Sequence, residues 1–368
     1  MDILLICVVA LLAFANGGND NFKGVATLWG AGLGSYWQAL TWATGYTFLG
    51  SITATWLGSG LAAKFSGAEL VGGAILKDPS FLIAVSAGTA ATVLLAAKLG
   101  LPISTTHALA GALVGTGIVA VGFSHMNFAS LGSGVVLPLL FSPIVALLLT
   151  VGIRVLAVRY IPSKEIPDCI CADQPARVAV AGNSHMSVTT ALVPSLRWAT
   201  ERECQTGQEI ARFRIMDGLH WFSAAAISYA RGLNDTPKIV AVLLIVPGAV
   251  IGRDYVLVAL AIAAGGMLAA RRVARTMSHE ITPMPAQEAV TSNLVAAALV
   301  TLASPLGLPV STTHVTSGGI FGIGLLRRHG ADWGKVREIL LSWVATLPMG
   351  AALAVLIYEM LLISVGKA

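Results

Sequence analysis

Long apolar segments follow one another along almost the whole chain, and they constrain its fold more than any other feature. These segments extend from Ile3 to Val365 with one polar break of any size. Only 11% of the 368 residues are charged, whereas soluble domains carry roughly a quarter. So few charges cannot build a water-facing surface. The sequence therefore predicts an all-α polytopic membrane protein, with most of its residues in lipid.

Ten membrane elements are expected, five in each half of the chain, with approximate boundaries. The first and sixth elements are expected to be interrupted by polar residues. The N-terminal run has no basic n-region, so we interpret it as a mature helix rather than a cleavable signal. The expected spans are roughly 3–32, 37–63, 81–99, 103–121 and 131–158, followed by 217–251, 254–270, 289–305, 310–327 and 338–365.

The polar break at 161–213 separates a first membrane repeat at 1–160 from a second at 214–368. It contains four prolines and most of the paired charges of the chain. Residues 176–180 alternate weakly between apolar and polar side chains, which indicates short strands. We predict a polar cytosolic linker, and the sequence assigns no chemistry to it.

Three of the four cysteines lie in this linker, at Cys169, Cys171 and Cys204. Cytosolic cysteines are ordinarily reduced, so we expect free thiols. The alternative is a zinc site completed by His185, although the spacing matches no familiar finger pattern. No metal is therefore assigned.

Two short motifs occur twice and in the same order. Residues 15–23 (Ala-Asn-Gly-Gly-Asn-Asp-Asn-Phe-Lys) match 230–238 (Ala-Arg-Gly-Leu-Asn-Asp-Thr-Pro-Lys). Residues 101–107 (Leu-Pro-Ile-Ser-Thr-Thr-His) match 308–314 (Leu-Pro-Val-Ser-Thr-Thr-His). The two offsets are nearly equal, which chance rarely produces, so the halves are predicted to be repeats.

An odd number of membrane elements in each copy makes the two copies enter the membrane in opposite directions, as inverted-topology repeats. Basic clusters at 154–164, 271–275 and 327–337 then fall on the side of the linker. By the positive-inside rule this side is the cytosol, and both termini lie outside a cell membrane. Basic residues at the ends of apolar segments are topology signals, so the net charge of +5 does not indicate nucleic-acid binding.

The Asn-Asp motifs place ionisable groups inside apolar segments, where each costs at least about 2.5 kcal/mol at the bilayer centre. Such residues need a functional reason or a partner. Neighbouring glycines and Pro237 favour broken helices whose freed backbone groups face a ligand. The alternative is that each aspartate merely pairs with the lysine three residues later. The residues are Asn19, Asp20 and Lys23, and Asn234, Asp235 and Lys238.

A proline followed by three hydroxyl residues is typical of a helix N-terminus, where unpaired N–H groups and the helix dipole attract an anion. A single such triplet would be interpreted as an ordinary N-cap. Two copies, each following an Asn-Asp motif, favour an oxyanion site instead. His107 and His314 come next and are either proton relays or packing residues. The triplets are Ser104, Thr105 and Thr106, and Ser311, Thr312 and Thr313.

These motifs resemble those of the inorganic phosphate transporters of the PiT type, which include sodium-coupled and proton-coupled members and some sulfate permeases. The family signature is approximately Gly-Ala-Asn-Asp-Val-Ala-Asn-Ala, to which 17–24 and 232–239 are similar, and the Pro-[Ile/Val]-Ser-Thr-Thr-His element is intact twice. The resemblance covers nearly the whole chain apart from the linker. It implies a site between the repeats near mid-membrane, lined by the Asn-Asp residues and the hydroxyl triplets, and a homodimer.

Lys23 and Lys238 depart from this signature, because both stand where the family has a second asparagine. Sodium-coupled members would use that asparagine near a cation, whereas an ammonium has three donors and no lone pair. We therefore expect a proton rather than sodium as the coupling ion, with both lysines coupling or compensating charge. The alternative is that the lysines extend to the interface as topology anchors.

The predicted function is secondary active transport of inorganic phosphate by alternating access, with phosphate and the lipid bilayer as partners and no cofactor. A sulfate or other oxyanion permease and a sodium-coupled phosphate symporter are the alternatives. A channel or a membrane enzyme fits less well, because paired broken helices are unlike a channel filter and no nucleophile or metal-ligand motif is present. Nothing resembles a P-loop, which argues against direct ATP drive.

Overall fold

The computed structural model describes residues 3–160, 167–173, 177–181, 186–190, 195–204, 209–326, 330–364 and 366. They form two compact units. The larger unit comprises Met1–Ile153 and Ser223–Ala368, and the smaller comprises Arg154–Phe222. The helices of both predicted repeats therefore contribute to one helical unit, while the polar break forms a unit of its own.

The helices of the first half follow the expected spans closely. The long ones are α1 (Ile3–Asp20), α3 (Tyr36–Leu57), α6 (Pro79–Leu99), α7 (Thr105–Val121) and α9 (Leu137–Tyr160). Shorter helical pieces connect them. These are η1 (Lys23–Val25), α2 (Ala26–Gly30), α4 (Ser59–Phe65), α5 (Ala68–Val71), η2 (Ile75–Lys77), η3 (Phe123–His125), α8 (Phe128–Leu131) and η4 (Gly132–Val136).

The second half repeats this order. Its long helices are α11 (Ile215–Leu244), α12 (Ile251–Ala269), α14 (Ala286–Ala303), α15 (Thr312–Leu325) and α16 (Trp333–Ser364). Short α13 (Arg271–Arg275) and the π-helical η5 (Thr276–Glu280) follow α12. Within the described residues, six helical segments are long and apolar enough to cross a membrane. The all-α polytopic fold is confirmed, whereas the inverted orientation of the copies stays a prediction.

The two Asn-Asp motifs have different backbones. As predicted, the first is interrupted, because α1 ends at Asp20 and a 3₁₀ turn at Lys23–Val25 leads into α2. The prediction of a second broken helix is wrong, since α11 continues through Pro237. A proline costs a membrane helix one hydrogen bond, but neighbouring helices make it tolerable.

The glycines of both motifs serve close helix packing rather than helix breaks. A Cβ on Gly17 would lie 2.0 Å from the carbonyl oxygen of Ile262, so α1 can approach α12 only with glycine there. A Cβ on Gly232 would lie equally close, 2.0 Å, to the carbonyl oxygen of Thr47 on α3. Small residues at such crossings let membrane helices pack backbone to backbone. Each motif helix is thus crossed by a helix of the other half.

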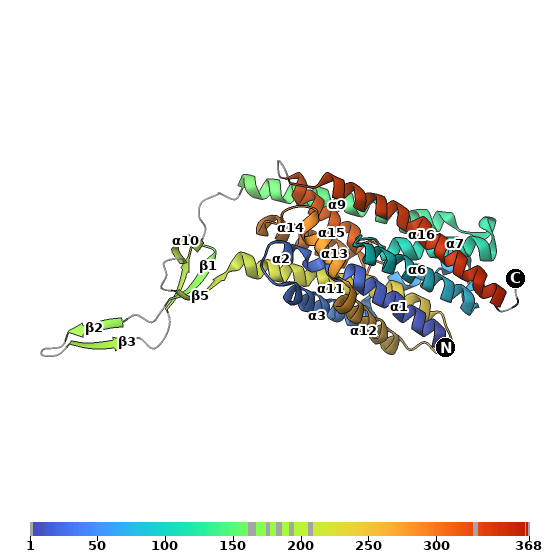
Figure 1. Cartoon of the computed structure of the whole chain (residues 1–368), viewed down its shortest axis with the longest axis horizontal. Helices are drawn as coiled ribbons and strands as arrows, with labels where there is room; N and C mark the ends of the chain where they lie inside the picture. The colour runs from blue at the N-terminus through green and yellow to red at the C-terminus, as the bar shows by residue number, and fades with distance from the viewer. Residues whose placement is uncertain are drawn as a thin grey trace. The chain divides into compact units, whose positions relative to one another are not determined.

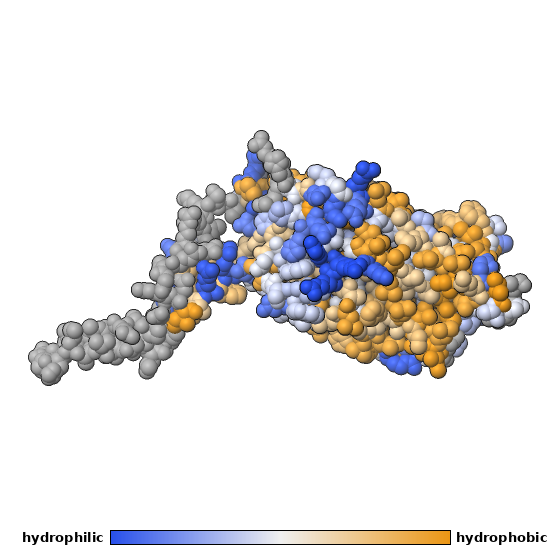
Figure 2. Space-filling view, in the orientation of Figure 1, coloured by the Kyte–Doolittle hydropathy of each residue, from blue (hydrophilic) through white to orange (hydrophobic). Residues whose placement is uncertain are grey.

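The last long helix of each half also packs across the other half. Gly111 of α7 faces the Leu347 carbonyl of α16, and Gly318 of α15 faces the Pro143 carbonyl of α9. Both termini lie at the same end of the helical unit (Figure 1). Figure 2 shows a broad apolar area on one face of this unit, and its exposed apolar residues include Leu268 and Val344, which are 78% and 75% exposed. Such a surface suits contact with lipid tails.

The smaller unit contains the short strands that the sequence indicated. Strand β1 (Cys169–Asp173) pairs antiparallel with β4 (Ser195–Ala199) and β5 (Glu209–Arg214), in the order β4-β1-β5. Strands β2 (Arg177–Ala181) and β3 (Met186–Thr190) form a separate antiparallel pair.

The expectation of free thiols in the linker is wrong for two of its cysteines. Cys171 on β1 forms a disulfide with Cys204 on α10 (Glu201–Cys204), with Cα atoms 5.7 Å apart. These two side chains and Cys169 are buried together in the small core of this unit, which brings the partners within bonding distance. His185, the fourth ligand of the zinc alternative, lies outside the described residues, as do Arg327 and Arg328 of the third basic cluster. Among the described residues, no group of three or more His, Cys, Asp or Glu is placed to hold a metal.

Candidate functional site

The first Asn-Asp motif lies at the end of α1, against the segment that leads into α7. Asp20 is buried, and its Oδ2 accepts hydrogen bonds from Asn16 Nδ2 (2.8 Å) and Thr105 Oγ1 (3.1 Å). Asn19 Nδ2 donates to the carbonyl oxygen of Leu101 (2.9 Å). The motif therefore contacts the first hydroxyl triplet of its own half through Asp20 and Thr105.

Lys23 connects this motif to the other half of the molecule. Its ammonium forms an ion pair with Asp20 and donates to Asn19 Oδ1 (2.7 Å) and to the Ile103 carbonyl (2.9 Å). It also donates to Thr313 Oγ1 (2.7 Å), a member of the second triplet. The lysine is buried, so the alternative in which it extends to the interface as a topology anchor is wrong for Lys23.

The second motif makes the equivalent contacts in α11. Asp235 Oδ2 accepts a hydrogen bond from Thr312 Oγ1 (3.2 Å), and Asn234 Nδ2 donates to Asp235 Oδ1 (3.0 Å) and to the Val310 carbonyl (3.1 Å). Lys238 is buried as well, which excludes the topology-anchor alternative here too.

Lys238 reaches back to the first half, as Lys23 reaches forward to the second. Its Nζ donates to the Val310 carbonyl (2.7 Å) and to Thr106 Oγ1 (3.0 Å), and it lies 3.6 Å from Asp235 Oδ1. Each copy thus supplies a lysine to a threonine of the other copy. Asn16 and Arg231 bridge Asp20 to Asp235, so that one chain of contacts joins both carboxylates, both lysines and the four threonines into one buried cluster.

Within each hydroxyl triplet, the serine and the threonines make different contacts. Ser104 and Ser311 cap α7 and α15, with each Oγ accepting a hydrogen bond from the backbone N–H of a histidine three residues later, at 3.2 Å and 3.3 Å. For the serines, the ordinary N-cap interpretation therefore describes their contacts. The threonine hydroxyls instead face the carboxylates and lysines. Of the two triplets, the threonines therefore supply the side chains that enter the cluster.

A small cavity of about 10 Å³ lies between the two copies. A volume of this size holds about one water molecule. Residues of both halves line it, so it marks the position where the two copies meet. The lining residues are Asn16, Thr105, Thr106, Leu109, Asp235, Lys238 and Ile239.

Sequence reasoning missed two members of this cluster, Asn16 and Arg231. Arg231 is buried on α11 and its guanidinium lies 3.6 Å from Asp235 Oδ2. An arginine inside an apolar segment was the available signal. A comparison of the two motifs does not highlight this arginine, because the first motif has Asn16 at the same position.

His107 and His314 lie in contact where α7 and α15 begin. Their ring centroids are 4.5 Å apart, and the His314 ring stacks on Trp343 with centroids 3.9 Å apart. His314 Nδ1 is also 3.2 Å from the Leu139 carbonyl oxygen. These contacts describe packing and hydrogen-bonding residues, which was one of the two predicted roles. The relay role stays a prediction.

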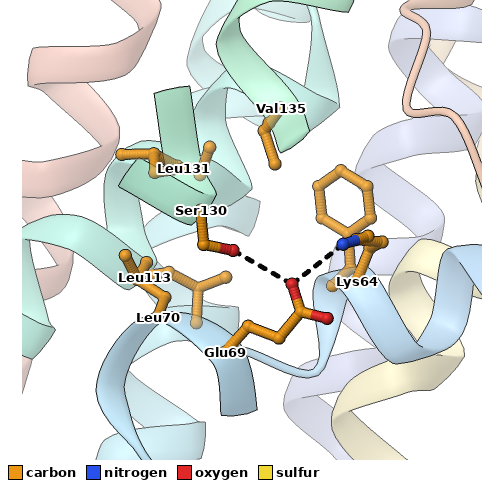
Figure 3. A pocket seen from close by; sticks show the side chains of 10 residues that line it. Lys64, Glu69, Leu70, Leu113, Ser130, Leu131 and Val135 are labelled. Atoms are coloured by element: carbon orange, nitrogen blue, oxygen red, sulfur yellow. Dashed lines mark hydrogen bonds and ion pairs between the residues drawn. The ribbon is translucent and has the colours of Figure 1, made fainter. Parts of the chain in front are cut away.

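A second pocket lies beyond Phe65, whose ring is 5.6 Å from Lys238 Nζ. At the pocket, Glu69 of α5 accepts hydrogen bonds from Lys64 Nζ on α4 (2.9 Å) and Ser130 Oγ on α8 (3.0 Å) (Figure 3). These two hydrogen bonds lower the pKa of Glu69. Phe65 thus lies near Lys238 of the cluster and also lines a pocket with mostly apolar walls.

Membrane-spanning helices that enclose a duplicated, buried polar cluster define a polytopic membrane transporter. Residues 16–354 match the phosphate transporter family, and the chain belongs to that family. The PiT resemblance is therefore confirmed. Because this is a family of transporters, the prediction that the chain is not an enzyme is confirmed too.

Relatives along the full length agree with this assignment. A "probable low-affinity inorganic phosphate transporter" of Bacillus subtilis is 26% identical over 378 residues, covering 98% of this chain and 99% of the relative. A protein of the same name from Rhizobium meliloti is 27% identical over 365 residues, covering 96% and 94%. A solved structure described as "The sodium-dependent phosphate transporter" has the same fold, with a TM-score of 0.76, 21% identity and 98% coverage of both chains.

Proposed function

We propose that this protein is a secondary active transporter that moves inorganic phosphate across the cell membrane by alternating access. Family membership supports phosphate as the substrate. One observation carries the choice of site: the two lysine-to-threonine hydrogen bonds that cross between the copies, Lys23 to Thr313 and Lys238 to Thr106. A group that binds there contacts both halves at once. Motion of one half against the other would then change the access to it.

Phosphate would replace contacts that the cluster now makes with itself. The cavity holds about one water, so the substrate has to part Lys238 from Thr106 before it can enter. The lysines and threonines then donate to phosphate oxygens, while Asp20 and Asp235 accept hydrogen bonds from P–OH groups. Asn19 and Asn234, whose amides already hold the backbone before each triplet, keep these donors in place.

This arrangement favours phosphate over sulfate. Near neutral pH phosphate keeps at least one proton to donate to a carboxylate, whereas sulfate has none. A buried site built around a hydrogen bond rejects a ligand that cannot make it, because its polar groups are left unsatisfied. We expect arsenate to compete with phosphate, and sulfate to compete at least about 100-fold less well.

We also infer a proton rather than sodium as the coupling ion. Hard cations bind oxygen ligands, and the Lys23 ammonium already takes the side-chain oxygens of Asn19, Asp20 and Thr313. A sodium ion would have to displace a buried, covalently attached cation. The lysines therefore occupy the space that a sodium ion would need near the carboxylates.

Uptake of labelled phosphate into proteoliposomes tests both inferences. Sodium is replaced by choline at fixed pH, a proton gradient is imposed separately, and arsenate and sulfate are added as competitors. We expect rates that do not change without sodium, that increase with an inward proton gradient, and that fall with arsenate. A steep sodium dependence would refute the coupling, and strong competition by sulfate without arsenate would refute the substrate.

We propose the orientation from the basic residues, with the linker in the cytosol and both termini outside. Arg154 and the cluster at 271–275 then lie on the cytosolic side. The Cys171–Cys204 disulfide would then lie in the cytosol, where disulfides are rare and usually transient or redox-sensing. Cleavage of a protease tag in the linker only in inside-out vesicles would support this orientation, and cleavage from outside would reverse the topology.

We also propose the homodimer that the resemblance implies. Cross-linking in membranes would test it.

A further inference from the structure

Arg231 is a buried cation to which the proposed transport cycle gives no role. It lies in α11, four residues before Asp235, and occupies the position that Asn16 holds in the first copy. Its side chain is 2% exposed and belongs to the largest fully buried side chains of the protein. A charge buried so deeply is expensive unless partners surround it.

Five oxygen atoms surround the guanidinium. Nη2 donates to Asn16 Oδ1 (2.6 Å) and lies 3.4 Å from the Asn16 carbonyl, while Nη1 donates to Asn21 Oδ1 (2.9 Å) and Thr47 Oγ1 (3.4 Å). The carboxylate of Asp235 is the fifth neighbour, 3.6 Å from Nε. Amide, carbonyl, hydroxyl and carboxylate oxygens are the ligands that hard metal cations take in proteins.

These oxygens belong mostly to the other half of the molecule. Asn16 and Asn21 flank the end of α1 and Thr47 is on α3, whereas Arg231 and Asp235 are on α11. The cation therefore holds the second motif against the first, across the boundary at which the cavity lies.

The guanidinium also fixes how Asn16 faces the cavity. Because the amide oxygen of Asn16 accepts from Arg231, its Nδ2 is directed to Asp20 Oδ2 (2.8 Å) and Thr105 Oγ1 (3.0 Å). Asn16 and Asp235 both line the cavity, although Arg231 does not. Arg231 thus acts on the site through two residues and is a positioning residue.

Arg231 also sets the charge of the cluster. With every group ionised, three cationic side chains face two carboxylates, which leaves one positive charge in excess. An anion that enters the cavity neutralises this excess, so the cluster needs no further cation to accept it. The charged members are Asp20, Lys23, Arg231, Asp235 and Lys238.

We propose that the Arg231 guanidinium is a built-in cation that takes the place of a dissociable metal cation, joining the two copies and orienting Asn16 and Asp235 toward the substrate. This inference rests on the proposed phosphate transport without sodium. If the inference is right, transport without sodium depends on Arg231 as well as on Lys23 and Lys238. A transporter whose cation is part of the chain cannot lose it during the cycle.

The test compares phosphate uptake by Arg231→Lys, Arg231→Gln and Arg231→Ala in media of choline, sodium or guanidinium chloride at millimolar concentration. Removing the charge should lower kcat/KM about 100-fold in choline for the glutamine and alanine variants, as expected for a buried charge partner. Sodium or guanidinium should restore at least about 10-fold of this loss in Arg231→Ala, because the side chain leaves space within the oxygen shell. Glutamine fills that space, so its variant should gain nothing.

Arg231→Lys keeps the charge but presents it as one ammonium instead of a planar fork, and we expect uptake within about 10-fold of wild type without added cation. Arg253→Ala removes an arginine whose side chain is 54% exposed on α12 and serves as the matched control, with uptake unchanged in all three media. Should Arg231→Ala fail to fold, the contrast between the lysine and glutamine variants decides. Wild-type uptake by Arg231→Gln, or a folded Arg231→Ala that neither cation rescues, would overturn the proposal. Steep sodium dependence of the wild type would instead defeat the proposed function.

Discussion

The two copies of the Asn-Asp motif carry the same chemistry on different backbones. In the first copy the helix ends at Asp20, and Lys23 in the following turn contacts four oxygen-bearing residues. In the second copy the helix is continuous, and Asp235 shares its carboxylate between Lys238 and Arg231, each 3.6 Å away. The first carboxylate is held tightly by one lysine, and the second loosely by two cations.

This difference indicates unequal roles for the two copies. Asp235 and Lys238 line the small cavity, whereas Asp20 and Lys23 do not. A looser ion pair beside the cavity is easier to part than the compact one between Asp20 and Lys23. We infer that phosphate meets the second copy first, and that the first copy engages it when the halves move.

The largest effects should come from the two carboxylates. Asp20→Asn and Asp235→Asn should each lower uptake about 100-fold or more, because each removes a buried charge whose cationic partners stay behind. The copies should differ in binding: phosphate should still protect Asp20→Asn against thermal unfolding, but not Asp235→Asn. Uptake and thermal unfolding in detergent measure the two quantities.

Asp78→Asn is the control for these variants, since Asp78 caps α6 and its Oδ1 accepts from the backbone of Ser80 rather than from the cluster. It should transport normally. Wild-type uptake by both motif variants would remove these aspartates from the site. Equal protection of both by phosphate would contradict the unequal roles of the copies.

Replacing either lysine should lower transport less than replacing an aspartate does. The two lysine variants should, however, differ clearly from each other in the free energy of unfolding. Lys23→Met leaves the Asp20 carboxylate buried without its cation, which should lower the free energy of unfolding by about 3–5 kcal/mol. Lys238→Met should cost about 1–3 kcal/mol, because Arg231 still faces Asp235. Denaturant unfolding of the two purified variants gives this comparison. A larger loss for Lys238→Met would reverse the assignment of the tighter pair.

The sequence predicted the parts of this molecule that depend on local pattern. Apolar length located the spans, and the duplicated motifs located the residues that form the cluster, because a buried ionisable group is conspicuous in an apolar segment. The sequence could not predict that the lysine side chains of each half would contact threonines of the other half. The bonds from Lys23 to Thr313 and from Lys238 to Thr106 depend on packing between elements far apart in the chain.

Two other features, the continuous helix α11 and the linker disulfide, could not be predicted from the sequence for different physical reasons. Gly232 and Pro237 suggested a helix break, but the glycine admits a neighbouring backbone and α11 continues through the proline. Helix packing and helix breaking use the same residue types, so composition alone does not separate them. The Cys171–Cys204 disulfide joins residues 33 positions apart, and the sheet that brings them together is not a local property.

The smallest effect is expected from the residue that differs most visibly between the two backbones. Pro237 lies inside α11 and has no N–H, so the Leu233 carbonyl lacks its usual helical donor. Pro237→Ala restores this bond, worth about 1 kcal/mol, but loses the contact of the proline ring with Gly58, where a Cβ would lie 2.4 Å from the ring. These changes nearly cancel, so the free energy of unfolding should change by less than about 1 kcal/mol.

The transport kinetics of Pro237→Ala show whether α11 bends at Pro237 during the cycle. If α11 bends at Pro237 during the cycle, a stiffer helix should slow turnover about 3-fold, equivalent to a barrier higher by about 0.7 kcal/mol, while KM for phosphate stays the same. Pro79→Ala is the matched control, because Pro79 is the first residue of α6, where no helical donor is missing. A raised KM with unchanged turnover would mean that Pro237 shapes the site instead. The second copy would then differ from the first in geometry alone and not in motion.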